Sequence, residues 1–232
     1  MMFDYLVLKL PFAFGGVSDA VYPVVLRDEN NLVLVDCGYL GFLPILEAAM
    51  AEQDLSCADL THVFITHHDH DHMGCLAALK QTYPNIRVIS SKAEAPYIAG
   101  ELPALRLVQA EAMQSGLPDE QKGFGEAFIR MLRQIEPVKV DQTVQDGDVL
   151  NFCGGCEIIA TPGHTAGHTS LYLPLLGVCV AGDAAVLEQG ALIVANPEYA
   201  QDLSQAKQSL EQIRQLGAKS IVCYHGGVYS AQ

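Results

Sequence analysis

The residues best suited to chemistry in this chain are histidines and aspartates concentrated in one short stretch. Residues 66–74 read Thr-His-His-Asp-His-Asp-His-Met-Gly and hold four of the eight histidines in the chain. The stretch follows an apolar run at residues 62–65, so its side chains are expected at the end of a strand, where ligand sites of α/β scaffolds often lie. Imidazole and carboxylate groups at this density are typical of metal ligands, with a solvent-exposed polar loop as the alternative.

Other candidate ligands also occur where apolar strands are expected to end. Residues 161–169 form a loop rich in glycine, proline and threonine that carries His164 and His168, and such a loop can bend tightly around a bound ion. Asp183 follows the apolar run at 178–181, and His225 follows the run at 220–223. This shared placement predicts one site built from several strand ends.

Other kinds of site have weaker support. The chain has no Gly-x-Ser-x-Gly motif for a serine nucleophile and no Walker-type phosphate loop. Cys153 and Cys156 have the spacing of a redox or metal motif, but a hairpin turn at the two glycines between them explains the spacing better. A redox role for this pair stays open.

Composition limits the partners and the compartment. Thirteen basic and 27 acidic residues give a net charge of −14, which disfavours nucleic acid and anionic membranes as partners and leaves a small-molecule substrate. The first residues lack a basic region, and Lys9 and Pro11 interrupt the apolar run that follows, so we expect neither a signal peptide nor a membrane anchor. Seven scattered cysteines favour a reducing, cytoplasmic setting. The oligomeric state is not indicated.

The elements that must position these residues follow from the hydrophobic pattern. Helical spacing is expected at 42–53, 75–83 and 198–216, with a helical insertion at about 92–137 near the site. Short apolar runs predict strands at 3–10, 21–26, 32–35, 62–65, 87–89, 138–144, 149–152, 157–160, 170–173, 178–181 and 220–223. Both halves of the chain are strand-rich and then helical, which predicts one domain over residues 1–232 with two sheets face to face and helices outside.

Five landmarks in order resemble the metallo-β-lactamase-fold superfamily. They are the segment 33–38, the histidine stretch 66–74, Pro162-Gly163-His164, Gly182-Asp183 and His225. The resemblance implies an α+β, four-layer αββα sandwich with two mixed, mainly antiparallel sheets. The chain is similar to the core of a glyoxalase II or a lactonase without the C-terminal extension.

The same resemblance implies a site for two divalent metal ions. It assigns the first ion to His67, Asp69 and His164, the second to Asp71, His72 and His225, and a bridging position to Asp183. The usual loop of the family reads His-x-His-x-Asp-His, whereas this chain has Asp69 at the second histidine position. Zinc is the expected metal, but because a carboxylate is a harder ligand than imidazole, iron or manganese is possible.

Roles for the surrounding residues follow from the same comparison. Asp71 and Asp183 are the expected catalytic residues, whereas His68 and His70 are expected at the rim. His168 is expected to form a hydrogen bond beside the ligands. Asp36 is expected either to orient a ligand histidine or to cap its strand, and Tyr224 either to donate to an oxyanion or to pack beside the centre. No arginine is apparent that could hold an oxyanion. Apolar substrate contacts are expected from Phe12, Phe14, Phe124 and Phe128.

The expected function is hydrolysis of a small ester, thioester or lactone by a metal-bound hydroxide. Two alternatives stay open on the same fold. One is a non-haem iron oxidoreductase, either persulfide dioxygenase-like or diiron. The other is a metal-binding or sensing module without catalysis.

Overall fold

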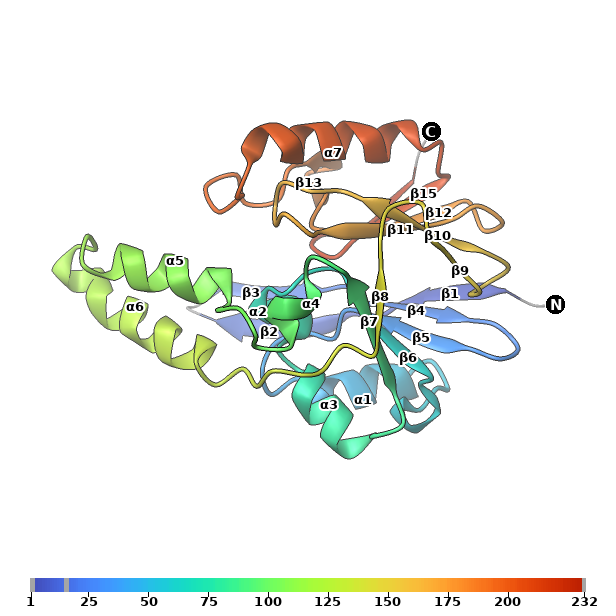
Figure 1. Cartoon of the computed structure of the whole chain (residues 1–232), viewed down its shortest axis with the longest axis horizontal. Helices are drawn as coiled ribbons and strands as arrows, with labels where there is room; N and C mark the ends of the chain where they lie inside the picture. Colours follow the sequence, from blue (N-terminus) through green and yellow to red (C-terminus); the bar gives the residue numbers. More distant parts are fainter. Residues whose placement is uncertain (1–2, 15–16, 231–232) are drawn as a thin grey trace.

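Two six-stranded sheets pack face to face, with helices on the outer side of each, in the computed structural model, which describes residues 3–14 and 17–230 (Figure 1). Helix α7 (Leu203–Gln215) covers one sheet, and helices α1 (Leu43–Ala51) and α3 (Leu76–Thr82) cover the other. This order of layers is the predicted αββα sandwich. None of the helices in the described ranges has the length and apolar character that a membrane crossing requires.

The first sheet is partly parallel, and the histidine stretch follows one of its strands. Its strands, in spatial order, are β1 (Asp4–Val7), β4 (Val24–Arg27), β5 (Leu32–Val35), β6 (His62–Ile65), β7 (Arg87–Ser91) and β8 (Gln142–Val144). Strands β5 to β8 run parallel, because the chain crosses back through α1 and the 3-10 turn η1 (Cys57–Asp59), then through α2 (His70–Met73) and α3. All four residues of β5 are buried, as expected for a strand covered on both faces.

The second sheet supplies the remaining site loops. Its strands, in spatial order, are β16 (Gly227–Ser230), β15 (Ser220–Cys223), β12 (Val178–Gly182), β11 (Thr169–Leu173), β10 (Cys156–Ala160) and β9 (Val149–Leu150). Among the described strands of this sheet, β12 and β15 pair in parallel and the other neighbours pair antiparallel. Helix α7 begins later than predicted, because the Asp202 side chain accepts a hydrogen bond from the backbone N–H of Gln205 and caps the helix there.

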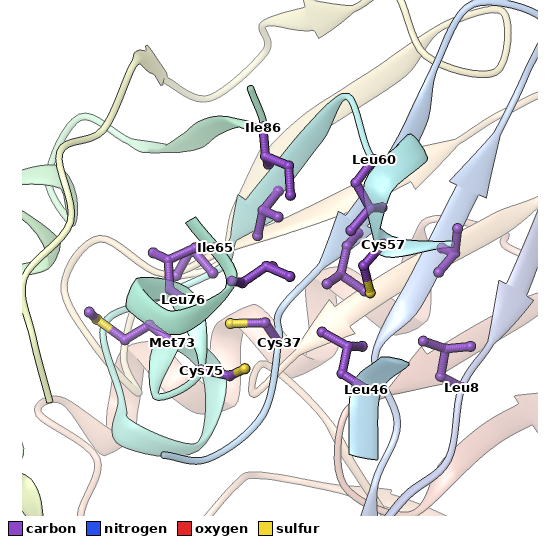
Figure 2. Close-up of a cluster of buried hydrophobic side chains, with 14 of the residues drawn as sticks. Leu8, Cys37, Leu46, Cys57, Leu60, Ile65, Met73, Cys75, Leu76 and Ile86 are labelled. Atoms are coloured by element: carbon purple, nitrogen blue, oxygen red, sulfur yellow. The ribbon is translucent and has the colours of Figure 1, made fainter. Parts of the chain in front are cut away.

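Apolar side chains fill the layers on both sides of the first sheet. Between the sheets, Phe64, Ile89, Leu171 and Val180 belong to one cluster. On the outer side, a second cluster includes Leu8, Cys37, Leu46, Cys57, Leu60, Ile65, Met73, Cys75, Leu76 and Ile86 (Figure 2). The three cysteines there pack as small apolar groups among aliphatic side chains.

Helices occupy much of the predicted insertion, and two of them project from the sandwich. They are α4 (Ala95–Ile98), α5 (Leu105–Gln114) and α6 (Asp119–Leu132). Helices α5 and α6 form a hairpin that extends beyond the end of the sheets (Figure 1). Helix α5 buries none of its residues fully, so the hairpin is less embedded in the core than the other helices.

Two small hairpins complete the fold. They are β2 (Leu10–Phe14) with β3 (Val17–Val21), and β13 (Val186–Glu188) with β14 (Ala191–Ile193). The predicted strand at 3–10 is therefore divided between β1 and β2.

Candidate metal centre

The ends of several strands bring the predicted ligands together. The histidine stretch follows β6, and the short helix α2 begins inside it at His70, ahead of α3, which is the helix expected at 75–83. The loop between β10 and β11 contributes His164, β12 ends just before Asp183, and β15 ends two residues before His225. These strands of the two sheets end in the same region of the sandwich, so residues more than 150 positions apart in the sequence become neighbours.

One group of side chains combines two histidines with the unusual aspartate. His67, Asp69 and His164 each offer one ligand atom, and these atoms lie within 4.8 Å of one another. The Oδ2 atom of Asp69 lies 3.1 Å from His164 Nε2 and 3.8 Å from His67 Nε2. All three residues are buried, so the group has the size and chemistry of a cation site.

A second group lies next to the first. Asp71, His72 and His225 also place ligand atoms within 4.8 Å of one another, with His225 Nε2 at 3.2 Å from Asp71 Oδ2. Asp183 stands between the groups. Its Oδ2 atom lies 3.5 Å from His164 Nε2, whereas its Oδ1 atom lies 3.2 Å from His72 Nε2 and 3.5 Å from His225 Nε2. The two carboxylate oxygens thus face different groups.

Four buried polar atoms of the ligand groups and of Asp183 have no hydrogen-bond partner within the part of the chain that the structure describes. They are His67 Nε2, His72 Nε2, His164 Nδ1 and Asp183 Oδ1. Buried polar atoms without a partner are uncommon, because each costs about 1–3 kcal/mol of desolvation. A divalent cation in each group would satisfy His67 Nε2, His72 Nε2 and Asp183 Oδ1, so the residues present fit a two-metal site.

Carboxylates and imidazoles shift each other's pKa in this cluster. Burial opposes ionisation of Asp183, but the adjacent His72 and His225 outweigh it and hold the pKa of Asp183 well below its usual range. Burial likewise opposes protonation of His72, yet Asp183, Asp36 and Asp71 raise its pKa well above the ordinary value. The carboxylates are therefore ionised at neutral pH and available as ligands.

Asp36 orients His72, as its position at the end of β5 suggested. One of its oxygens accepts a hydrogen bond from the Thr66 backbone N–H at 2.9 Å. The other accepts from the Thr66 hydroxyl at 2.8 Å and from His72 Nδ1 at 2.9 Å. In neutral His72 this bond keeps the proton on Nδ1, so the Nε2 lone pair faces the other members of the second group.

His168 and Tyr224 also hold neighbours of the centre in place. His168 Nε2 accepts a hydrogen bond from the Asp183 backbone N–H at 2.9 Å, and its Nδ1 lies 2.8 Å from the Thr161 hydroxyl. Both ring nitrogens are thus engaged in hydrogen bonds. The Tyr224 hydroxyl donates to the Asp71 carbonyl at 2.6 Å, and its ring centroid lies 4.0 Å from that of His72. Tyr224 therefore points into the protein.

His68 lies in the interior, and its expected place at the rim was wrong. Its backbone N–H donates to Glu94 Oε2 at 2.9 Å, its Nδ1 contacts the same oxygen, and its ring stacks on Tyr97 at 4.4 Å. The other Glu94 oxygen accepts from the Thr165 hydroxyl at 2.6 Å and the Gly167 N–H at 3.0 Å. Glu94 thus joins the loops that carry the histidines. A single glutamate in a helix-forming region gave no sequence signal for this role.

Arg106 is a second residue that the sequence did not reveal. Its Nη2 atom lies 2.8 Å from Asp69 Oδ2, so the expectation that no arginine lies at the site was wrong. Its guanidinium also lies 4.6 Å from the ring centroid of Tyr199. Arg106 belongs to α5, and only the docking of the helical hairpin brings it to the centre.

A cavity of about 560 Å³ lies between the centre and the α5–α6 hairpin. Residues of both groups line it together with an apolar set on the hairpin, which comprises Ala110, Met113, Leu117, Phe124 and Phe128. The Phe128 ring also lies 5.3 Å from the His70 ring, edge to face. Phe12 does not line this cavity and packs against Tyr39 instead, and the Phe14 side chain is outside the part that the structure describes.

Comparisons with known proteins agree with this geometry. Residues 18–225 match the family model described as the metallo-beta-lactamase superfamily. The chain is 26% identical over 184 residues to the uncharacterized protein YobT of Bacillus subtilis (strain 168), covering 78% of this chain and 70% of YobT. It is 29% identical over 208 residues to the hydroxyacylglutathione hydrolase of Bartonella henselae, covering 87% of this chain and 64% of that protein.

A further hydroxyacylglutathione hydrolase, from Photobacterium profundum, is 30% identical over 128 residues, covering 55% of this chain and 43% of that protein. The chain therefore spans about half to two thirds of the length of these two relatives. A metallo-beta-lactamase family protein from Thermus thermophilus has the same fold, with a TM-score of 0.76, 24% identity, and coverage of 97% of this chain and 74% of that chain. The family match over residues 18–225, on a sandwich with histidines and aspartates at its strand ends, shows that this chain belongs to the metallo-β-lactamase superfamily.

Proposed function

We propose that this protein is a metal-dependent hydrolase of a small ester, thioester or lactone, with two divalent cations at one centre. One observation carries the proposal: the two oxygens of Asp183 face two different groups of histidine and aspartate side chains. Partnerless imidazole nitrogens in both groups support it. The names of the hydroxyacylglutathione hydrolases among the relatives support an acyl substrate.

In this proposal each group would hold one cation, and Asp183 would serve both. His67, Asp69 and His164 would hold the first cation, and Asp71, His72 and His225 would hold the second. Bound divalent cations would polarise a substrate carbonyl and lower the pKa of a coordinated water toward neutrality. Zinc is the proposed metal, and Asp69 makes iron or manganese the natural competitors, because a carboxylate favours harder ions.

The protein side chains orient and hold protons around that chemistry. Asp36 keeps the proton of His72 on Nδ1, and the Asp183 N–H bond to His168 fixes the backbone next to the bridging carboxylate. The low pKa values of Asp71 and Asp183 keep both carboxylates ionised at neutral pH. An oxygen of these side chains that a cation leaves free could accept a hydrogen bond from a water molecule and orient it.

The cavity favours a substrate with an apolar acyl group. Met113, Leu117, Phe124 and Phe128 provide an apolar wall beside the centre, and burying each methylene of an acyl chain there contributes roughly 0.8 kcal/mol of binding. The net charge of −14 supports a small molecule over a nucleic acid.

Metal content and hydrolysis measured on the same preparations test this proposal. Unsupplemented protein should carry close to two equivalents of a divalent metal and cleave at least one member of a panel of esters, thioesters and lactones. Asp183→Ala and His164→Ala should lose metal and hydrolysis together, whereas Asp59→Ala, at an exposed aspartate outside both ligand groups, should keep both.

Three outcomes would contradict the proposal. Retained turnover in Asp183→Ala at normal metal content would show that the centre is not the site of hydrolysis. Iron with redox-active spectra and no hydrolysis would favour the oxidoreductase alternative. Fully metallated protein that cleaves no member of the panel would favour a binding or sensing module.

A further inference from the structure

Arg106 contacts the carboxylate at which this chain departs from the usual ligand pattern. Its Nη2 atom lies 2.8 Å from Asp69 Oδ2, and that same oxygen lies 3.1 Å from His164 Nε2. The side chains of Arg106 and Asp69 are only 11% and 8% exposed. Among the described residues, Arg106 is the one lysine or arginine that forms an ion pair with Asp69, Asp71 or Asp183.

The guanidinium of Arg106 is held by the surrounding structure. Its Nη1 atom donates to Gln109 Oε1 at 3.2 Å, and the group lies over the Tyr199 ring. One residue earlier, the Leu105 backbone N–H points to His68 Nε2 at 3.4 Å, and His68 is itself held by Glu94. Helix α5 therefore begins beside the histidine stretch, and its second residue, Arg106, lies directly against Asp69.

Formal charges show what this placement achieves. The seven candidate ligands include three carboxylates, Asp69, Asp71 and Asp183, so with neutral imidazoles their charge is −3. Arg106 brings this to −2, the charge that the set would have with a histidine in place of Asp69. A guanidinium stays protonated in proteins, so this compensation does not vary with pH.

We propose that Arg106 is a positioning residue whose fixed positive charge offsets the third carboxylate, so that Asp69 and Arg106 together present the charge of one neutral ligand. The inference rests on the proposed two-cation function. It also gives the α5–α6 hairpin a second role beside forming the cavity wall, because the hairpin supplies a charge that sets the cation affinity of the centre.

A double-mutant cycle with zinc alone as the probe tests the inference by the sign of each effect. Arg106→Gln removes a positive charge near the cations and should tighten zinc binding at least about tenfold, because a charge only a few ångströms away interacts strongly in a buried site. Asp69→His keeps Arg106 but removes a carboxylate and should weaken binding by a similar factor. The double variant should return to within about threefold of the wild type, since the two changes cancel.

Zinc affinity is measured by competition with a chromophoric chelator, and stoichiometry by elemental analysis. Arg106→Lys retains the charge and should stay within about threefold of the wild type. Arg130→Gln is the matched control, because it changes an arginine of the same hairpin whose side chain is 65% exposed, and it should leave zinc affinity unchanged.

Thermal unfolding of the metal-free proteins gives an independent readout. Arg106→Gln should lower the midpoint temperature of unfolding, because Asp69 then lacks its arginine partner. The double variant should return this temperature toward the wild-type value. The inference would be overturned if Arg106→Gln bound zinc more weakly than the wild type. It would also be overturned if the double variant lost more zinc affinity than either single variant. Unchanged affinity in Arg106→Gln would overturn the inference alone, whereas a wild-type protein that binds no divalent metal would overturn the proposed function as well.

Discussion

Replacing Asp36 with asparagine removes a hydrogen-bond acceptor behind the centre and leaves the side-chain volume almost unchanged. Asp36 is buried and has a φ of 60°, a left-handed conformation that asparagine tolerates better than most residues. The substitution is therefore expected to act through hydrogen bonding and not through backbone strain.

The contacts of Asp36 set the size of the effect. The carboxylate accepts from the Thr66 N–H, the Thr66 hydroxyl and His72 Nδ1, whereas an asparagine amide has one accepting oxygen. In one orientation of the asparagine amide its NH2 group would face the Thr66 backbone N–H, and in the other it would face the N–H of His72 Nδ1. Either orientation therefore places two donors against each other. The Thr66 hydroxyl also lies 3.1 Å from His67 Nδ1, so the disturbance reaches a candidate ligand in each group.

Two magnitudes follow from these contacts. One buried donor without an acceptor should lower the free energy of unfolding of the metal-free protein by about 1–3 kcal/mol. Loss of the group that orients a ligand histidine should weaken cation binding by about 10- to 100-fold. That range corresponds to about 1.4–2.8 kcal/mol of binding free energy.

Urea unfolding of metal-free protein and chelator competition for zinc measure the two effects separately. Asp54→Asn is the matched control, because Asp54 also has a positive φ, of 55°, but is exposed and belongs to neither ligand group. It should change neither quantity. If Asp36→Asn bound zinc within about twofold of the wild type, Asp36 would not orient His72 and the reasoning would be refuted.

Three further outcomes are expected. Although burial opposes protonation, nearby carboxylates raise the pKa of His72, His164 and His225 above 6.5 in the metal-free protein. The stabilisation from these protons is complete below about pH 6.5 and is lost as pH rises through the folded-state pKa values. The metal-free melting temperature should therefore fall as the pH rises above about 6.5 while zinc binding strengthens, and a rising melting temperature would contradict this. All seven cysteines are free and buried, and burial raises the pKa of the Cys75 thiol to about 12, so a thiol reagent at about pH 8 should label them only after denaturation; rapid labelling of two thiols in folded protein would revive a redox role. Phe128→Ala should lower kcat/KM for long acyl substrates about tenfold and leave zinc content unchanged, and equal losses on short and long substrates would exclude acyl recognition by this wall.

The local pattern of the sequence was enough to predict the layers and the position of the candidate ligands along the chain. A run such as Leu32–Val35 is apolar at every residue, which marks a strand covered on both faces. The polar residues that follow such runs must leave the sheet at its edge. Together with the resemblance to the metallo-β-lactamase superfamily, this placement allowed His67, Asp183 and His225 to be selected without knowledge of their distances.

The side chains that support that site are set by contacts that form when distant segments pack together. Glu94 and Arg106 are ordinary members of a helix-forming region by sequence, and they reach His68 and Asp69 across 26 and 37 residues. These contacts depend on how the helical segment packs against the sandwich. Hydrophobic periodicity marks the buried face of an element, but it does not encode the docking angle that brings one charged residue to a site.

Asp183 also combines a feature that the sequence predicts with contacts that depend on folding. The place of this carboxylate after β12 can be predicted from the sequence, because the apolar run ends at Ala181 and a glycine follows, and in the structure Gly182 turns the backbone at a φ of 54°. That one oxygen faces His164 and the other faces His72 was decided by the packing of the two sheets. A strand end sets where a side chain emerges, whereas its partners come from strands that are distant in sequence and close only after folding.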